Sequence, residues 1–212
     1  DAFAITWVEM QDIEADDLIG TISKKATDYQ TYVLTSDHDM LQLVDDTTSV
    51  LLMKKGITDM DVMTPESLKE QMGIEPLQII DMKGLMGDKS DNIPGIPGIG
   101  EKTALKLLEE YGTVENVLAN EDKLKGALQK KVMEGHESAL LSKKLATIRR
   151  DVDVEMSEKE LSFTPNYPQL VKFLQMLEMN TLARRFTDKI VAEENKPEEI
   201  VVTPSEDKRV TK

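Results

Sequence analysis

Residues 88–104, DKSDNIPGIPGIGEKTA, hold two prolines and three glycines within the seven positions Pro94–Gly100. A run so rich in turn-forming residues predicts a tight hairpin rather than a helix or a strand. Helical periodicity precedes it, from Pro76 to about Met86, and resumes at Glu101–Tyr111, where Gly112 is suited to end the helix. The stretch therefore predicts two helices joined by a hairpin, a helix–hairpin–helix.

The hairpin has features of an anion site. Gly98 and Gly100 flank an apolar residue just before a helix, and without Cβ atoms their backbone N–H groups would let a phosphate come close. Lys102 and Lys106 add positive charge in the next turns. A plain Gly/Pro turn between two structural helices is the alternative, because GxG turns alone are weak motifs.

Upstream of the hairpin, helices and strands alternate, which predicts an α/β layer with a parallel sheet. The expected elements are a helix at Ala15–Ala26, a strand at Thr31–Thr35, a helix at Met40–Val44, a strand at Ser49–Met53 and a helix that starts at Thr64-Pro65-Glu66. Downstream only helices are expected, apart from one last strand. They are Glu101–Tyr111, Val114–Leu118, Leu124–Met133, Glu137–Ile148 and a pair within Tyr167–Phe186, with the strand at Val152–Met156.

The 212 residues carry a net charge of −14, spread unevenly. Residues 1–93 hold 7 basic and 19 acidic side chains, a net charge of −12, whereas residues 94–150 have a net charge of +2. We expect three parts: an α/β core at 1–93, a helical helix–hairpin–helix region at 94–190, and a flexible tail at 191–212, which is charged and aperiodic. An acidic protein binds nucleic acid poorly unless its negative charge is neutralised locally, for example by metal.

Three acidic clusters lie in the negative segment, each next to a predicted turn. They comprise Glu14, Asp16 and Asp17; Asp37 and Asp39; and Asp88 and Asp91. The first two have an ordinary explanation, because acids near a helix start complement the helix dipole and cap its N–H groups. The third lies in a polar loop between two predicted helices, and each cluster is ambiguous by itself. However, Asp37 and Asp39 follow a predicted strand, where α/β folds place ligands.

If these seven carboxylates share one pocket, their repulsion requires cations. Mg²⁺ or Mn²⁺ suits an all-oxygen ligand set, and two such ions roughly 3.5–4 Å apart support phosphodiester chemistry. This ligand set does not suit zinc, because the chain has no cysteine and its histidines are only His38 and His136. On this view, Asp39→Ala would relieve repulsion and leave the metal-free protein as stable as the parent or more so.

Composition excludes several other classes. No apolar run is long enough to span a membrane, and the start, DAFAITWVEM, lacks the basic region of a signal peptide. Nine aromatic residues do not indicate a base-stacking platform. Lys130-Lys131 and Lys143-Lys144 are interpreted as solvated helix faces. A reducing, intracellular setting is compatible with this composition.

Together, five segments resemble the 5′-nuclease family, most closely its exonuclease domains joined to bacterial DNA polymerases. They are EADD at 14–17, TSDHDMLQL at 35–43, KGITDMDVMTPE at 55–66, KGLMGDKSDNIPGIPGIGEKTA at 83–104 and LLEEYGTVENVL at 107–118. The resemblance runs from about Glu14 to Arg150, and more weakly through Tyr167–Phe186.

The resemblance implies metal-dependent 5′–3′ exonuclease and 5′-flap endonuclease activity on DNA with 5′ ends, flaps or nicks, in replication and repair. It implies two Mg²⁺ or Mn²⁺ ions, a K⁺ ion at the hairpin, and a polymerase domain following on the same chain. The implied metal ligands are Glu14, Asp16, Asp17, Asp37, Asp39, Asp88 and Asp91, of which Asp16, Asp17, Asp37 and Asp39 are implied to be catalytic. The implied DNA contacts are Gly95, Gly98, Gly100, Lys102, Thr103 and Lys106.

The family pattern starts upstream of this sequence, with further aspartates and a basic arch that threads the 5′ strand. We therefore expect the chain to be the carboxy-terminal part of a nuclease domain, and to cleave flaps more slowly than a complete domain. Two rivals stay open. One is a non-catalytic, structure-specific DNA-binding helix–hairpin–helix module, and the other is an Asp-x-Asp phosphatase with Asp37 as its nucleophile.

Overall fold

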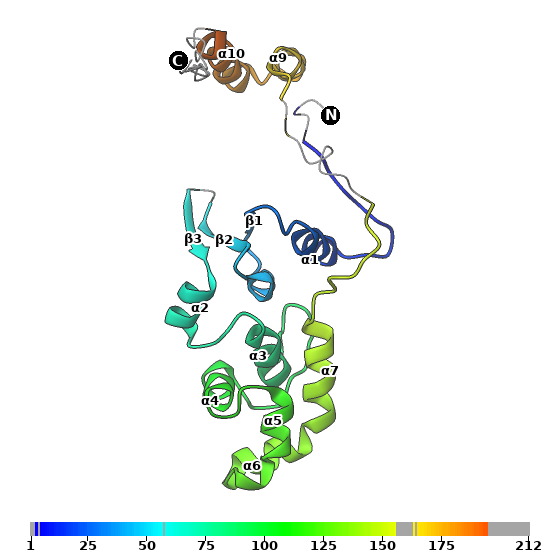
Figure 1. The fold of residues 1–212 in the computed structure, drawn as a ribbon, viewed down its shortest axis with the longest axis vertical. Coiled ribbons are helices and arrows are strands. Elements are labelled where there is room, and N and C mark those ends of the chain that lie inside the picture. Colours follow the sequence, from blue (N-terminus) through cyan, green and yellow to red (C-terminus); the bar gives the residue numbers. More distant parts are fainter. Residues whose placement is uncertain (1–2, 4, 57, 156–162, 164, 195–212) are drawn as a thin grey trace, which may run out of the picture. The chain divides into compact units, whose positions relative to one another are not determined.

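A computed structural model describes residues 3, 5–56, 58–155, 163 and 165–194. It divides into two compact units, Val8–Glu155 and a smaller one formed by Asp1–Trp7 with Met156–Lys212 (Figure 1). The larger unit contains these elements: α1 (Ala15–Lys25), β1 (Thr31–Thr35), the 3₁₀ helix η1 (His38–Leu43), β2 (Thr48–Lys55), β3 (Asp59–Met63), α2 (Pro65–Met72), α3 (Gln78–Met86), α4 (Glu101–Tyr111), α5 (Val114–Ala119), the 3₁₀ helix η2 (Glu121–Lys123), α6 (Gly126–Glu134) and α7 (His136–Ala146).

The sheet has three strands in the order β1-β2-β3. β1 and β2 are parallel, with Val33 opposite Val50, as the alternation of elements predicts. β2 and β3 are antiparallel, with Val50 opposite Met63. Val33, Val50 and Met63 are all buried, so one face of the sheet joins the main core.

Strand β3 was not predicted from the sequence. Its residues, DMDVM, include two aspartates, which are uncommon in strands, and among them only Met63 is buried. The strand exists because it pairs along β2, where Lys54 Nζ and Asp61 Oδ2 lie 2.7 Å apart. The helix predicted at Met40–Val44 is instead the short 3₁₀ helix η1, which starts two residues earlier.

Helix α3 is the central helix of the larger unit. Every residue from Ile79 to Leu85 is buried, and the helix packs against α7, α4 and η1. Gly84 permits the close approach of α7, because a Cβ there would lie 3.0 Å from Lys143 Cβ. Asp81 and Lys83 are the two charged residues in this buried run, and each has a partner.

The strand predicted at Val152–Met156 is wrong for the part described, residues 152–155, which form no strand. Side chains of α1 instead form hydrogen bonds with the backbone of this segment. Val152 N–H donates to Thr21 Oγ1, and Lys25 Nζ donates to the Val154 carbonyl. Because these bonds satisfy the backbone locally, the segment needs no neighbouring strand.

The smaller unit contains the helix pair predicted within Tyr167–Phe186. Its helices are α9 (Tyr167–Met176) and α10 (Asn180–Glu194), and Leu170, Leu174 and Ala183 form their small core. Helix α10 extends to Glu194, past the predicted start of the tail at residue 191. The rest of the predicted tail, 195–212, lies outside the described residues. The proposed boundaries of the three parts stay a prediction.

Candidate metal centre

Three segments of the larger unit bring acids to adjoining hollows: the start of α1, the turn between β1 and η1, and the loop between α3 and α4. One pocket of about 430 Å³ is lined by six of the predicted acids, Glu14, Asp16, Asp17, Asp37, Asp39 and Asp91. A second pocket of about 670 Å³ is lined by Asp37, Asp39, Asp88 and Asp91. All seven predicted acids therefore line one pocket or both, with Asp37, Asp39 and Asp91 shared.

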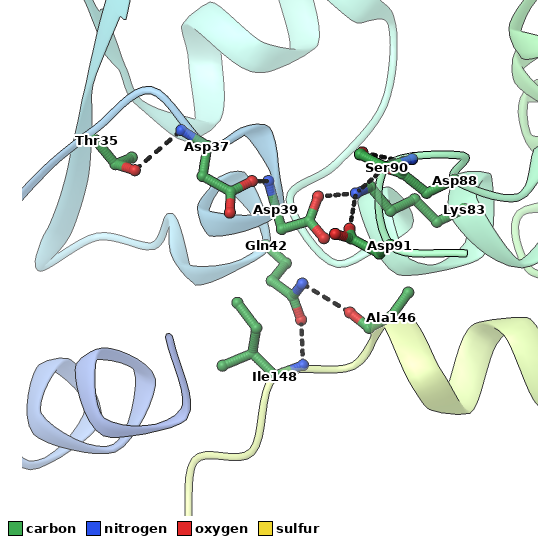
Figure 2. A network of polar contacts seen from close by, with 10 residues as sticks. All are labelled: Thr35, Asp37, Asp39, Gln42, Lys83, Asp88, Ser90, Asp91, Ala146 and Ile148. Carbon is green, nitrogen blue, oxygen red and sulfur yellow. Dashed lines mark hydrogen bonds and ion pairs between the residues drawn. The ribbon is translucent and has the colours of Figure 1, made fainter. Parts of the chain in front are cut away.

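Asp37 and Asp39 occupy different positions on η1. Asp37 is the N-cap, and its exposed carboxylate accepts a hydrogen bond of 2.9 Å from the Asp39 N–H. This bond is the helix cap that the sequence offered as the ordinary explanation. Asp39 makes no such cap. Its side chain is only 13% exposed and points toward α3 (Figure 2).

Asp88 and Asp91 are set by a compact loop after α3. Asp88 and Ile93 exchange two backbone hydrogen bonds of 2.9 and 2.7 Å, and Asn92 has a positive φ of 57° between them. The Asp88 carboxylate accepts hydrogen bonds from both the N–H and the hydroxyl of Ser90. The loop thus turns two carboxylates spaced three residues apart toward Asp39.

Oxygen atoms of Asp39, Asp88 and Asp91 lie within 4.8 Å of one another. This spacing fits a single hard cation with oxygen ligands. In the described residues, the other four predicted acids join no comparable group of three. Glu14 is exposed and makes no cap hydrogen bond at the start of α1. Asp17 Oδ1 accepts a hydrogen bond of 2.7 Å from the Arg149 N–H, so one of its oxygens is engaged structurally.

Lys83 is the site residue that sequence analysis missed. Its ammonium lies against the Asp39 carboxylate, 2.6 Å from Asp88 Oδ2 and 3.9 Å from Asp91 Oδ2 (Figure 2). The hydrogen bond from Lys83, helped by those from Ser90, lowers the pKa of Asp88 to about 2. The available signal was Lys83 in the otherwise largely apolar run IIDMKGLM, because a lysine on a buried helix needs an acidic partner.

Gln42 fixes this end of η1 to the end of α7. Its side-chain amide donates to the Ala146 carbonyl at 3.0 Å and accepts from the Ile148 N–H at 2.9 Å (Figure 2). All three residues are buried. Because Ala146 and Ile148 also line the smaller acidic pocket, Gln42 holds two of its walls together.

The hairpin glycines differ in what they do. Gly95 has a φ of 59°, and a Cβ there would lie 2.1 Å from the Gly87 nitrogen. Its N–H donates to the buried Ser142 hydroxyl and its carbonyl accepts from Ser138. Gly95 is therefore tied into the protein, with its own N–H already used.

Gly98 and Gly100 lie nearer the surface. Gly98 has a φ of 79°, and its carbonyl accepts a hydrogen bond of 2.9 Å from Lys131 Nζ. Gly100 is the N-cap of α4, with an ordinary φ of −108° and open space where a Cβ would stand. Backbone strain thus explains a glycine at Gly98 but not at Gly100.

The start of α4 offers unpaired donors. Within the described residues, the N–H groups of Gly98, Gly100, Glu101 and Lys102 have no protein acceptor. Lys102 and Lys106 are exposed, while Thr103 is half-buried in the first turn. Glu101 also lines the larger acidic pocket, so the hairpin and the acids adjoin.

Two lysines predicted as solvated have structural contacts instead. Lys131 reaches the hairpin, as described above. Lys143 donates to Asp81 Oδ1 and to Glu115 Oε2, both at 2.7 Å. Partial burial lowers the pKa of Lys143, but these two hydrogen bonds outweigh it and raise the pKa overall. The Lys143 side chain is directed toward α3 because the buried Asp81 carboxylate needs a positively charged partner.

The fold has counterparts among solved structures of 5′ nucleases. A bacteriophage T5 5′-exonuclease with bound zinc superimposes with a TM-score of 0.57 at 22% identity, over 86% of this chain and 60% of that one. A bacteriophage T5 flap endonuclease complex with DNA and metal ions gives 0.57 at 21% identity, over 88% and 62%. At sequence identities this low, the similarity is evidence of a shared fold only.

Sequence comparison then gives the family. The family model of the 5′–3′ exonuclease N-terminal resolvase-like domain matches residues 1–73, and that of the 5′–3′ exonuclease C-terminal SAM fold matches residues 74–169. The chain belongs to the 5′–3′ exonuclease family.

Its curated relatives are bacterial DNA polymerases I. That of Bacillus caldotenax is 52% identical over 76% of this chain, and that of Bacillus subtilis is 46% identical over 87%. The chain spans about a fifth of the length of these relatives, 19% and 22%. In the part of the chain that the structure covers, no helix is long and apolar enough to cross a membrane.

Proposed function

We propose that this chain forms part of a divalent-metal-dependent 5′–3′ exonuclease and 5′-flap endonuclease that hydrolyses DNA phosphodiesters. Family membership and the nuclease fold support the reaction class. The observation that carries the proposal is the convergence of Asp39, Asp88 and Asp91 from two distant segments to within 4.8 Å. Helix capping alone would not bring these carboxylates together, because a capping side chain contacts only the N-terminus of its own helix.

These carboxylates fit a divalent ion. Their donor set is all oxygen, and the remaining acids of the smaller pocket extend it toward α1. When bound, a divalent ion supplies Lewis-acid activation of water and of the scissile phosphate. We assign Asp39, Asp88 and Asp91 to one ion, with Asp16, Asp17 and Asp37 on the side where a second would bind. Mg²⁺ is the proposed ion, with Mn²⁺ as its substitute.

The hairpin is the proposed duplex contact. Its unpaired N–H groups lie at the start of α4, where the helix dipole favours a phosphate. Lys102 and Lys106 add charge on the same helix. Because Glu101 borders the acidic pocket, a strand held here would lie close to the carboxylates. K⁺ at the hairpin stays a proposal, as do a following polymerase domain and a cytoplasmic, nucleoid-associated location.

Cleavage of a 5′-flapped duplex tests this function. We expect product with Mg²⁺, none with EDTA, and loss of product in Asp39→Asn and Asp91→Asn. Asp46→Asn is the matched control, because Asp46 is exposed and has no partner in the described structure. Duplex binding without cleavage in any metal would favour the non-catalytic module. Burst release of phosphate from a small phosphate ester, lost in Asp37→Asn, would favour the phosphatase.

A further inference from the structure

Lys83 is unlike the other lysines of the larger unit, because its ammonium is buried among the acids of the candidate metal centre. The side chain is 7% exposed. Its neighbours are the same three carboxylates, Asp39, Asp88 and Asp91, whose oxygens are spaced for one cation. The ammonium therefore lies where a positive ion would be attracted.

An ordinary structural ion pair would look different. Lys143 and Asp81 form such a pair on the other side of α3, where the Asp81 carboxylate also accepts the Val114 N–H at 2.8 Å. That backbone bond holds the carboxylate in place with or without the lysine. Among the described residues, no backbone N–H donates to the Asp39 carboxylate, and Lys83 is its partner.

We propose that the Lys83 ammonium is the resident counter-cation of Asp39, Asp88 and Asp91, and that it competes with a divalent ion for their oxygens. The competition rests on the proposed function, since it requires that these carboxylates bind metal. Three carboxylates within 4.8 Å repel one another strongly in a half-buried site, and one ammonium offsets part of that repulsion. A divalent ion would meet both the carboxylates and the positive charge already among them.

The placement of Lys83 suits this exchange. Its backbone is fixed on the buried helix α3, whereas its ammonium ends a flexible four-carbon chain that can swing aside. Asp91 is 53% exposed, so an ion would enter from its side. Lys83 thus preserves the arrangement of the acids without metal and weakens metal binding at the same time.

Mn²⁺ titration of the 212-residue chain tests the competition. In Lys83→Met, a substitution that keeps an unbranched apolar stem in the helix, we expect Mn²⁺ to bind at least tenfold more tightly. Lys89→Met is the matched control, because Lys89 is exposed in the same loop without a partner in the described structure, and its affinity should change less than threefold. Unchanged or weaker binding by Lys83→Met would overturn the competition. If the parent chain itself binds no Mn²⁺, the result contradicts the proposed function, on which the competition rests.

Metal-free melting temperatures test the counter-cation directly. In the parent, Asp39→Asn should lower Tm in EDTA, because Lys83 loses a partner. In the Lys83→Met background the same change should raise Tm, because it now removes only repulsion. A shift of about 3 °C in each direction is expected for a chain of this size. The same sign in both backgrounds would overturn the proposal.

Discussion

The Lys83 ammonium donates to Asp88 Oδ2 at 2.6 Å, from a helix whose neighbouring residues are all buried. This pair joins the central helix of the core to the acidic loop.

The Lys83–Asp88 pair makes the free energy of unfolding depend on pH. In the folded state the pKa of Asp88 falls to about 2, from about 3.8 in the unfolded chain. The contribution of the Asp88 carboxylate to the free energy of unfolding is therefore complete above pH 3.8 and is lost as the pH falls through 2. We expect the parent to be about 2 kcal/mol more stable than Asp88→Asn at pH 6 in EDTA. Denaturation at several pH values checks this. A difference that stays constant down to pH 2 would contradict it.

Gly95→Ala should destabilise the chain strongly, because the new Cβ would meet the Gly87 backbone at 2.1 Å and φ is 59°. A loss of about 3 kcal/mol or more is expected in urea denaturation. Gly126→Ala is the control, since its φ is 61° but no atom lies within 4 Å of the Cβ, and about 1 kcal/mol is expected. Equal losses would show that the close approach does not matter.

Gly100→Ala should separate binding from stability. The backbone is ordinary there and a Cβ has open space, so Tm should stay within about 2 °C of the parent. We expect weaker duplex binding at low salt, because the methyl group would stand between the free N–H groups and a phosphate. Binding equal to that of the parent would make the hairpin a simple connector.

Gln42→Leu should weaken the joint between η1 and α7, because it leaves the Ala146 carbonyl and the Ile148 N–H buried without partners. A loss of about 2–3 kcal/mol is expected in urea denaturation. Gln30→Leu, at an exposed position, should change stability by less than about 0.5 kcal/mol. Similar losses in both variants would contradict a specific role for Gln42.

Much of the fold was predictable because its signals are local. The strand at Thr31–Thr35 and the helix at Glu101–Tyr111 have the predicted bounds, since each combines strong periodicity with clear ends. Strand β3 was missed because its stability comes from pairing with β2 rather than from its own composition. The hairpin was evident from its prolines and glycines, but their separate roles depend on distant residues such as Ser142 and Lys131.

The acids that line the two pockets were named from the sequence, whereas the lysine among them was not. Repulsion alone predicts that removing Asp39 leaves the metal-free protein as stable or more so, whereas the Lys83 contact reverses the expected sign. The pairing of Lys83 with Asp39 joins residues 44 positions apart, on elements that meet only in the folded chain. A linear pattern shows that a buried charge needs a partner, but it does not show which one.

The most direct test of the metal centre is Mn²⁺ binding by the parent chain and by the double variant Asp39→Asn/Asp91→Asn, measured by calorimetry. We expect binding by the parent and by the control Asp46→Asn. In the double variant, whose circular dichroism spectrum should match that of the parent, we expect an affinity at least a hundredfold lower, because two of the three carboxylate ligands are lost. Parent-like Mn²⁺ affinity in the double variant would show that Asp39 and Asp91 are not ligands of the ion.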